Sequence, residues 1–186
     1  MKIRIYSILL VSVLLSLSVS AQGLKDEHKG VYRAYDFDAP RVDEPAPKGY
    51  EVFCLSHYGR HGSRFLYNEA EYDTLNVVLN RESLTATGEK VRDKFNENYP
   101  IFKGRAADLT ELGQKQHRLL ARRMMDDYPN LFRKGSEVYA FSSDRTRCMM
   151  SMYCFLDELR ICRKGLNIHA DYKSTFLKYL RAQHPE

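Results

Sequence analysis

The sequence predicts an α/β domain in which a mostly parallel sheet is flanked by helices. Short β-favouring runs alternate with longer segments whose apolar residues recur at helical spacing, a pattern typical of parallel sheets with helical crossovers. Two of the runs lead directly into arginine-rich segments, residues 59–64 and 142–147. Ligands of such sheets bind beyond the carboxyl ends of the strands, so we expect a ligand site at these two segments.

Residues 1–21 have the pattern of an export signal. A basic start at residues 1–4 precedes an apolar stretch at residues 8–19, and Val19-Ser20-Ala21 suits cleavage before Gln22. The apolar stretch is short for a membrane span, and nothing later in the chain approaches one. We therefore expect a periplasmic or secreted protein with no stable membrane span after signal removal. A signal anchor is the alternative.

Charge and length limit the classes of partner. The formal net charge of +5 falls to +3 when the two basic residues of the signal are removed. That balance is too small to indicate nucleic-acid binding, but it is compatible with a small anionic ligand. About 165 residues remain after the signal, enough for one domain with its own core.

The chain carries four cysteines after the signal: Cys54, Cys148, Cys154 and Cys162. In an exported protein an even number permits two disulfides, and the pairing stays open. There is no C-x-x-C pair and no histidine at zinc-finger spacing, so the sequence predicts no structural metal site.

The mature chain is expected to start as extended polypeptide. Residues 22–48 are polar and proline-bearing, which favours an extended lead-in, and the domain itself is expected to cover residues 49–186. A buried strand is predicted at Tyr50 to Ser56, where the composition is β-favouring.

Helical spacing follows the first arginine-rich segment. It predicts a helix at Glu69 to Leu79 and a second one from about Thr87, with a loop at residues 104–107. Together these elements make residues 66–105 a helical insertion or lid.

Thr110 to Tyr128 is the clearest predicted helix, with Asp108 or Thr110 as its cap. The apolar residues expected to form its inner side are Leu112, Leu119, Leu120, Met124 and Tyr128. His117 is expected to be exposed, and Arg122 and Arg123 to lie on a solvated face.

The remaining elements complete the alternation. A strand is predicted at Glu137 to Ser142, then a helix that reaches about Arg163 and ends at Gly165. Leu166 to Ala170 is predicted as a further strand.

The two arginine-rich segments have the chemistry of a phosphate site. Planar guanidinium groups bind phosphate oxygens in pairs, and several of them stabilise the charge of a transferring phosphoryl group. His61 among them offers a ring nitrogen as nucleophile, and the nearby positive charges lower its pKa and keep it neutral. Gly59 and Gly62 allow the backbone to approach the phosphate closely.

These residues also carry a family resemblance. Arg60-His61-Gly62-Ser63-Arg64 resembles the R-H-G-x-R signature of the histidine acid phosphatases, the larger branch of the histidine phosphatase superfamily. Residues 109–113 with Gln116 resemble the family's L-T-x-x-G-x-x-Q helix start, and residues 142–151 resemble the segment that delivers another phosphate-binding arginine. The resemblance covers residues 50–156, and the motifs occur in family order.

The resemblance implies a role for each matching residue. His61 would be the nucleophile that becomes phosphohistidine, and Arg60, Arg64 and Arg147 would hold the phosphate. Arg147 fits the family's R-x-x-x-S pattern better than Arg145. The resemblance implies neither a metal nor an organic cofactor.

Two further residues, Arg145 and Ser63, are expected to contact the substrate. The sequence R-H-G-S-R-F at residues 60–65 and the Arg147-Cys148 pair look most like the multiple inositol polyphosphate phosphatase subgroup. That likeness implies a phytate-like substrate.

The sequence departs from the family pattern in two places. Leu66 stands where the family commonly has proline, which affects loop stiffness more than chemistry. The family's proton donor comes from a histidine motif near the end of a longer chain, so we expect this sequence to be an N-terminal portion, with the domain incomplete at its C-terminus and the donor beyond Glu186. His184-Pro185-Glu186 has the H-x-E wording but comes early.

The leading hypothesis is an exported phosphomonoesterase that hydrolyses inositol polyphosphates through phosphohistidine. One alternative is a truncated pseudoenzyme that binds phosphate without turnover. Another is a compact, mutase-like member of the smaller branch, in which His169 or His184 would face His61.

Overall fold

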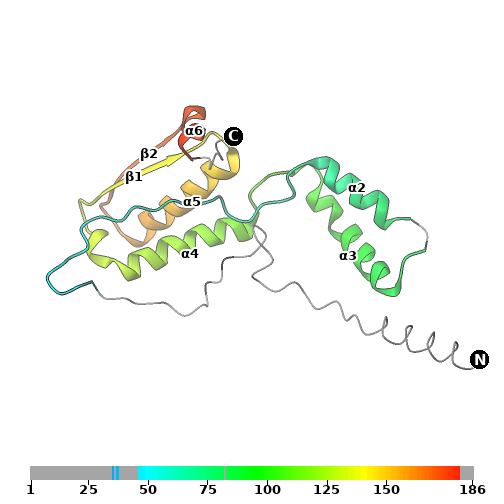
Figure 1. Cartoon of the computed structure of the whole chain (residues 1–186), viewed down its shortest axis with the longest axis horizontal. Coiled ribbons are helices and arrows are strands. Elements are labelled where there is room, and N and C mark those ends of the chain that lie inside the picture. Colours follow the sequence, from blue (N-terminus) through cyan, green and yellow to red (C-terminus); the bar gives the residue numbers. More distant parts are fainter. Residues whose placement is uncertain (1–34, 36, 38–45, 82, 181–186) are drawn as a thin grey trace, which may run out of the picture. The chain divides into compact units, whose positions relative to one another are not determined.

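The computed structural model describes residues 35, 37, 46–81 and 83–180 (Figure 1). The chain divides into two units, residues 1–36 and 37–186, and the elements below belong to the second. The predicted signal, most of the predicted lead-in and His184 lie outside the described residues. The predicted fold class is confirmed, because two parallel strands are combined with flanking helices.

The described elements follow in the order α2 (Glu69–Leu79), α3 (Ala86–Phe102), α4 (Glu111–Asp127), η3 (Pro129–Leu131), β1 (Glu137–Ser142), α5 (Thr146–Cys162), β2 (Asn167–Tyr172), η4 (Ser174–Phe176) and α6 (Leu177–Leu180). The predictions for α2, α4 and β1 are confirmed, and β2 is shifted slightly toward the C-terminus of its predicted range. Helix α3 begins before Thr87 because the Thr85 hydroxyl accepts a hydrogen bond from the Gly88 amide at 3.1 Å and caps the helix there.

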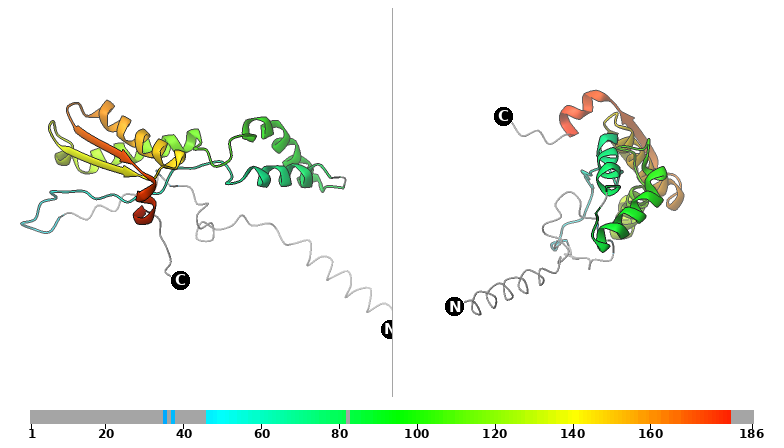
Figure 2. Two further views of the ribbon diagram at one scale, coloured as in Figure 1. Left: turned by 90° about the horizontal axis from the view of Figure 1, so that it is seen from above. Right: turned by 90° about the vertical axis from the view of Figure 1, so that its right-hand side faces the viewer.

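Strands β1 and β2 form a parallel pair with α5 as the crossover between them (Figures 1 and 2). Their register runs from Glu137 opposite Asn167 to Ser142 opposite Tyr172. Val138 on β1 faces the core, whereas the neighbouring side chains of the opposite face are exposed. The sheet therefore has one packed face and one open face.

The prediction of a strand at residues 50–56 is wrong. This segment is extended but forms no ladder with β1 or β2. Phe53 is 91% exposed, while Leu55 packs against the core. A strand needs a partner for its backbone N–H and C=O groups, and β-favouring composition does not supply one.

The core lies between α4 and α5, with β1 and β2 packed against it. Its buried residues are Ala121 and Met125 of α4, Leu156 and Leu159 of α5, and Phe132. Neighbouring apolar residues that complete it include Leu131, Val138, Ala140 and Ile168. Helices α4 and α5 consequently form the scaffold against which β1 and β2 pack.

The inner face of α4 differs from the prediction. Leu112, expected inside, is 54% exposed, and Leu119 and Leu120 are only partly buried. The buried residues of the helix are Gly113, Gln116, His117, Ala121 and Met125. The two small residues of this face, Gly113 and Ala121, allow close approach to the preceding loop and to α5, and this packing outweighs the hydropathy of the leucines.

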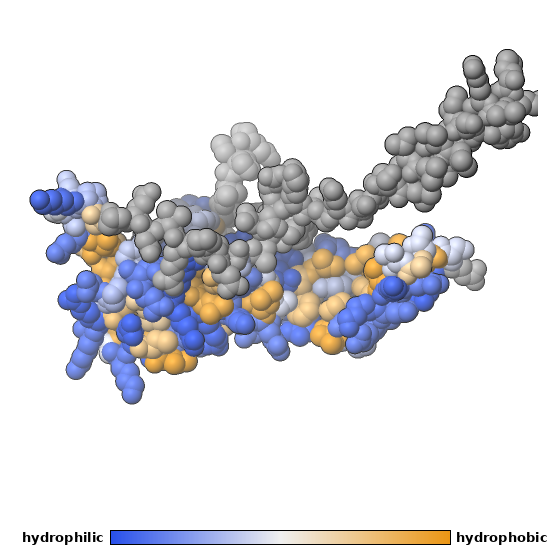
Figure 3. Space-filling model, turned by 90° about the horizontal axis from the view of Figure 1, so that it is seen from below, coloured by the Kyte–Doolittle hydropathy of each residue, from blue (hydrophilic) through white to orange (hydrophobic). Residues whose placement is uncertain are grey.

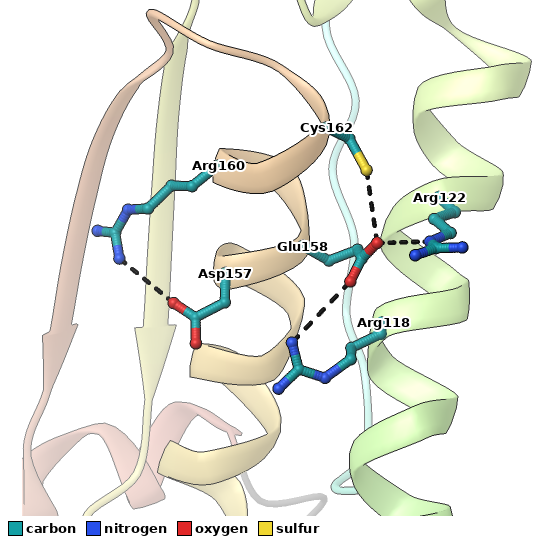
Figure 4. Close-up of polar contacts among 6 residues, drawn as sticks. All are labelled: Arg118, Arg122, Asp157, Glu158, Arg160 and Cys162. Carbon is teal, nitrogen blue, oxygen red and sulfur yellow. Dashed lines mark hydrogen bonds and ion pairs between the residues drawn. The ribbon is translucent and has the colours of Figure 1, made fainter.

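A buried carboxylate joins α4 to α5 (Figure 4). The Glu158 side chain is 3% exposed and accepts a hydrogen bond from Arg122 Nε, while Arg118 Nη1 lies 3.9 Å from its second oxygen. The Cys162 thiol donates to Glu158 Oε1 at 3.4 Å. Burial opposes ionisation, but these partners outweigh it and hold the pKa of Glu158 below its ordinary value. Arg122, expected on a purely solvated face, is therefore an interhelical contact.

All four cysteines are free thiols, so the two disulfides that an even count permits are not formed. Within the described part of the chain, no helix is long and apolar enough to cross a membrane.

Helices α2 and α3, which both lie within residues 66–105, pack on each other. Tyr72 stacks on Phe102 with ring centroids 5.5 Å apart, and the Tyr99 hydroxyl donates to Asp73 at 2.9 Å. Apolar side chains also lie on the molecular surface (Figure 3), and those exposed on this helix pair are Leu75, Val77, Val78, Val91 and Ile101. The helical content of the predicted insertion is thus present, and its role as a lid stays a prediction.

Replacing Arg122 with methionine is expected to lower the midpoint of urea unfolding by on the order of half a molar, because Glu158 would keep a buried charge after losing its closest cationic partner, with Arg118 3.9 Å away as the remaining cation. Far-UV circular dichroism during a urea titration measures the change. The matched control is Lys115→Met at an exposed site of the same helix, with an unchanged midpoint. Adding Glu158→Leu to Arg122→Met should restore the midpoint, and no recovery would contradict a role for the buried charge.

Candidate functional site

Residues 59–64, here called the signature loop, are tied to the segment before α4 by a short antiparallel bridge. The Phe65 amide donates to the Asp108 carbonyl at 3.0 Å, and the Thr110 amide donates to the Ser63 carbonyl at 2.9 Å. The Thr110 hydroxyl donates to the same carbonyl at 2.9 Å and accepts from the Gly113 amide, which caps α4. The loop and the start of α4 therefore form one hydrogen-bonded unit.

The first turns of α4 contact the backbone of the signature loop. Gln116 Oε1 accepts a hydrogen bond from the Ser63 amide at 2.8 Å. Gly113 lets the two backbones touch, because a Cβ atom on it would lie 2.2 Å from the Ser63 carbonyl oxygen. A Cβ atom on Gly62 would lie 2.4 Å from the Gly113 carbonyl oxygen, so both positions require glycine for lack of space.

Helix α5 holds the loop from another direction. The Gly62 amide donates to Ser151 Oγ at 3.1 Å, one turn beyond Arg147 at the start of the helix. This bond brings the second arginine-rich segment to the first. The sequence motifs contained Gln116 and Ser151 without a role for either, and the structure assigns both to support of the loop.

The His61 ring is oriented by the backbone of its own loop. Nδ1 lies 2.9 Å from the Gly62 carbonyl oxygen. A carbonyl can only accept, so Nδ1 carries the proton and Nε2 keeps a lone pair. The tautomer required of a nucleophile acting through Nε2 is thus set by one hydrogen bond.

The electrostatic surroundings keep His61 neutral. Burial of the ring lowers its pKa below the ordinary value, and the hydrogen bond to Gly62 offsets part of this. The charges of Arg147, Arg60 and Arg64 lower the pKa further. These three residues are called the clamp arginines below.

Tyr67 lies against two of the clamp arginines. The guanidinium carbon of Arg64 is 5.3 Å from the centroid of the Tyr67 ring, and that of Arg147 is 5.4 Å from it. Tyr67 lies outside the sequence motifs, so it was not among the predicted site residues.

Arg147 retains an unused donor. Its Nε is buried and has no hydrogen-bond partner among the described residues. Buried donors in proteins are paired in the great majority of cases, so this nitrogen is suited to an acceptor brought by a ligand.

The remaining predicted site residues are placed differently. Arg145 is the N-cap residue of α5 and is exposed, and its charge is not among those that act on His61. The backbone of Ser63 is engaged by Gln116 and Thr110. Substrate contact by Arg145 and Ser63 stays a prediction.

His117 was expected to be exposed and is instead 7% exposed. It lies one residue after Gln116 on the inner face of α4 and hydrogen-bonds the backbone of Arg60. Burial lowers the pKa of His117 from 6.5 to about 4, and the nearby His57 and His61 rings act in the same direction. It is therefore a neutral histidine that supports the signature loop. Its spacing of four from Gly113 and Ala121 was the signal for its burial.

A family model for the histidine phosphatase superfamily (branch 2) matches residues 56–157, more than half of the chain. The matched range contains the signature loop, α4 and Arg147. A search of curated proteins found no match.

Alanine at position 113 is expected to destabilise the protein by about 1 to 3 kcal/mol, although alanine normally stabilises a helix relative to glycine. The reason is the collision of its Cβ with Ser63. Thermal and urea unfolding measure the loss. The matched control is Gly88→Ala in α3, where the nearest atom is a side-chain carbon at 3.2 Å. Equal stability of the two variants would contradict the close contact.

Protonation of His117 is expected to make the protein acid-sensitive. The unfolded chain takes up a proton near pH 6.5 and the folded protein only near pH 4, so stability falls as the pH is lowered through this window. Between pH 7 and pH 4.5 this residue should cost about 2 kcal/mol of unfolding free energy. Urea titrations of the wild type and His117→Gln at both pH values test this, since the glutamine should remove that part of the slope. Parallel curves for the two proteins would show that His117 does not titrate as stated.

Proposed function

Since this chain belongs to branch 2 of the histidine phosphatase superfamily, we propose that it hydrolyses phosphomonoesters with His61 as the nucleophile. Membership of the branch, expected from the motifs, is confirmed by the family match. The class of enzyme is therefore a phosphatase, and its substrate is a small phosphorylated molecule. The inositol polyphosphate phosphatase subgroup stays a prediction.

The observation that carries the proposal is the state of His61. Its Nδ1 donates to the Gly62 carbonyl, which leaves Nε2 unprotonated, and burial and the clamp arginines lower its pKa. A neutral imidazole surrounded by guanidinium groups is what attack on an anionic phosphate ester requires. Because the pKa is lowered, the neutral, nucleophilic form of His61 persists to lower pH than it does for an ordinary histidine.

The reaction follows from this geometry. Guanidinium groups of Arg60, Arg64 and Arg147 would bind the phosphate oxygens, with Arg147 Nε as one free donor. His61 Nε2 attacks phosphorus and forms a P–N bond, while the P–O bond to the alcohol breaks. The leaving alkoxide takes a proton from a general acid or from solvent, and the water that attacks in the next step returns that proton. Water then attacks phosphorus, the P–N bond breaks, and inorganic phosphate is released with His61 restored. The positive charges stabilise the charge on the equatorial oxygens in both steps.

The finer proposal is an exported enzyme that acts on inositol polyphosphates. Its support is the wording of the signature loop, the Arg147-Cys148 pair, and a concentration of cationic side chains suited to a substrate with several phosphates. Export to the periplasm or the medium is supported by the basic and apolar pattern of residues 1–21.

The test compares p-nitrophenyl phosphate and phytate, with wild type and His61→Ala. Nitrophenolate leaves without a proton, so its release reports the nucleophile and the clamp, whereas an inositol alkoxide also needs a proton donor. We expect turnover of p-nitrophenyl phosphate that is lost by at least a thousandfold in His61→Ala. The matched control, His169→Ala, replaces an exposed histidine of β2 and should keep the activity.

Each result has a distinct meaning. Alkali-stable, acid-labile phosphate on the wild type, absent from His61→Ala, would identify the phosphohistidine. Hydrolysis of phytate would support the finer substrate, and hydrolysis of the aryl ester alone would restrict the proposal to the reaction type. Equal activity of the wild type and His61→Ala would overturn the proposal. Phosphate binding by a folded wild type that releases no nitrophenolate would favour the pseudoenzyme.

A further inference from the structure

Tyr67 is the point at which the two halves of the phosphate clamp meet. Arg64 comes from the signature loop and Arg147 from the first turn of α5, two segments far apart in the sequence. Their guanidinium carbons lie 5.3 Å and 5.4 Å from the centroid of the same Tyr67 ring. Both distances are within the range of a cation–π interaction.

Bringing these guanidinium groups together has an electrostatic cost. Two like charges repel each other, and both of these are close enough to act on His61 as well. The ring of a tyrosine has a negative face that attracts cations. One ring shared by two guanidinium groups therefore opposes their separation when no phosphate is present to neutralise them.

The ring holds the arginines without consuming the donors that a phosphate needs. It contributes a π face and no hydrogen-bond acceptor, and Arg147 Nε, which is buried, has no hydrogen-bond partner among the described residues. Arg64 uses Nη1 for the Phe65 carbonyl at 2.7 Å and has further N–H groups on its fork. Tyr67 itself is 53% exposed, so its ring is not there to fill the core.

We propose that Tyr67 is a positioning residue for the phosphate site, whose ring holds Arg64 and Arg147 together so that a phosphate meets a preorganised pair. This inference rests on the proposed function. Tyr67 acts through the two arginines and does not touch the reacting atoms. Its effect belongs to phosphate affinity, because preorganisation reduces the cost of ordering side chains on binding.

The experiment measures binding of inorganic phosphate by isothermal titration calorimetry, with KM and kcat for p-nitrophenyl phosphate beside it. Tyr67→Leu removes the π face and is expected to raise the dissociation constant for phosphate roughly 5- to 30-fold, the loss expected for two exposed cation–π contacts. Tyr67→Phe keeps the ring and is the matched control, with affinity within about twofold of the wild type. KM should rise with the dissociation constant.

Two further measurements separate this role from a general structural one. Phenylalanine at position 67 with increasing ring fluorination keeps the shape and weakens the negative face, so phosphate affinity should fall step by step with the number of fluorines. In an Arg147→Ala background the effect of Tyr67→Leu should shrink, because one of its two partners is gone. The fluorinated series gives the answer even where Tyr67→Leu impairs folding.

The outcomes distinguish the inference from the function on which it rests. Phosphate binding by the wild type together with unchanged affinity in the fluorinated series overturns the role of Tyr67 and leaves the phosphatase proposal in place. A folded wild type that neither binds phosphate nor releases nitrophenolate overturns both. A graded loss of affinity at constant melting temperature supports the positioning role.

Discussion

The rest of the site depends on a contact between two stretches of backbone, the signature loop and the first turn of α4. At Gly62 and Gly113 there is no room for a side chain on either partner. This closeness lets Gln116 reach the Ser63 amide and the Thr110 hydroxyl reach the Ser63 carbonyl. The loop thus takes its shape from contacts with the start of α4.

Helices α4 and α5 together place the charged groups. Helix α4 holds the loop that carries His61, while α5 begins with Arg147 and binds the Gly62 amide through Ser151. Their shared core and the buried Glu158 resist sliding of one helix against the other, because a slide would separate the carboxylate from its partners. The placement of His61 and Arg147, the proposed nucleophile and one proposed phosphate ligand, therefore depends on this helix pair.

Charge and neutrality are both arranged in the site. Three arginines bring positive charge near His61, where the proposed function needs it for a phosphate, yet burial lowers the pKa of His61 and His117, and the same arginines lower that of His61 further. A cationic His61 would lose its nucleophilic lone pair. A cationic His117 would place an unpaired charge under the loop. Positive charge is thus confined to groups that can meet an anionic ligand.

The sequence by itself determined the α/β class and the bounds of α2 and β1, and it predicted a site of His61 with Arg60, Arg64 and Arg147. Local spacing and short motifs encode these features, since helical periodicity and neighbouring residues need no knowledge of distant contacts. The tertiary structure decided what depends on a partner far along the chain. Residues 50–56 form no strand because no described strand pairs with them, and α4 buries Gly113 and His117 instead of its leucines because its neighbours demand close approach. The contact of Arg122 with the buried Glu158 depends on the packing of α5 beside α4. The contacts of Tyr67 with Arg64 and Arg147 depend on the packing of α5 beside the signature loop.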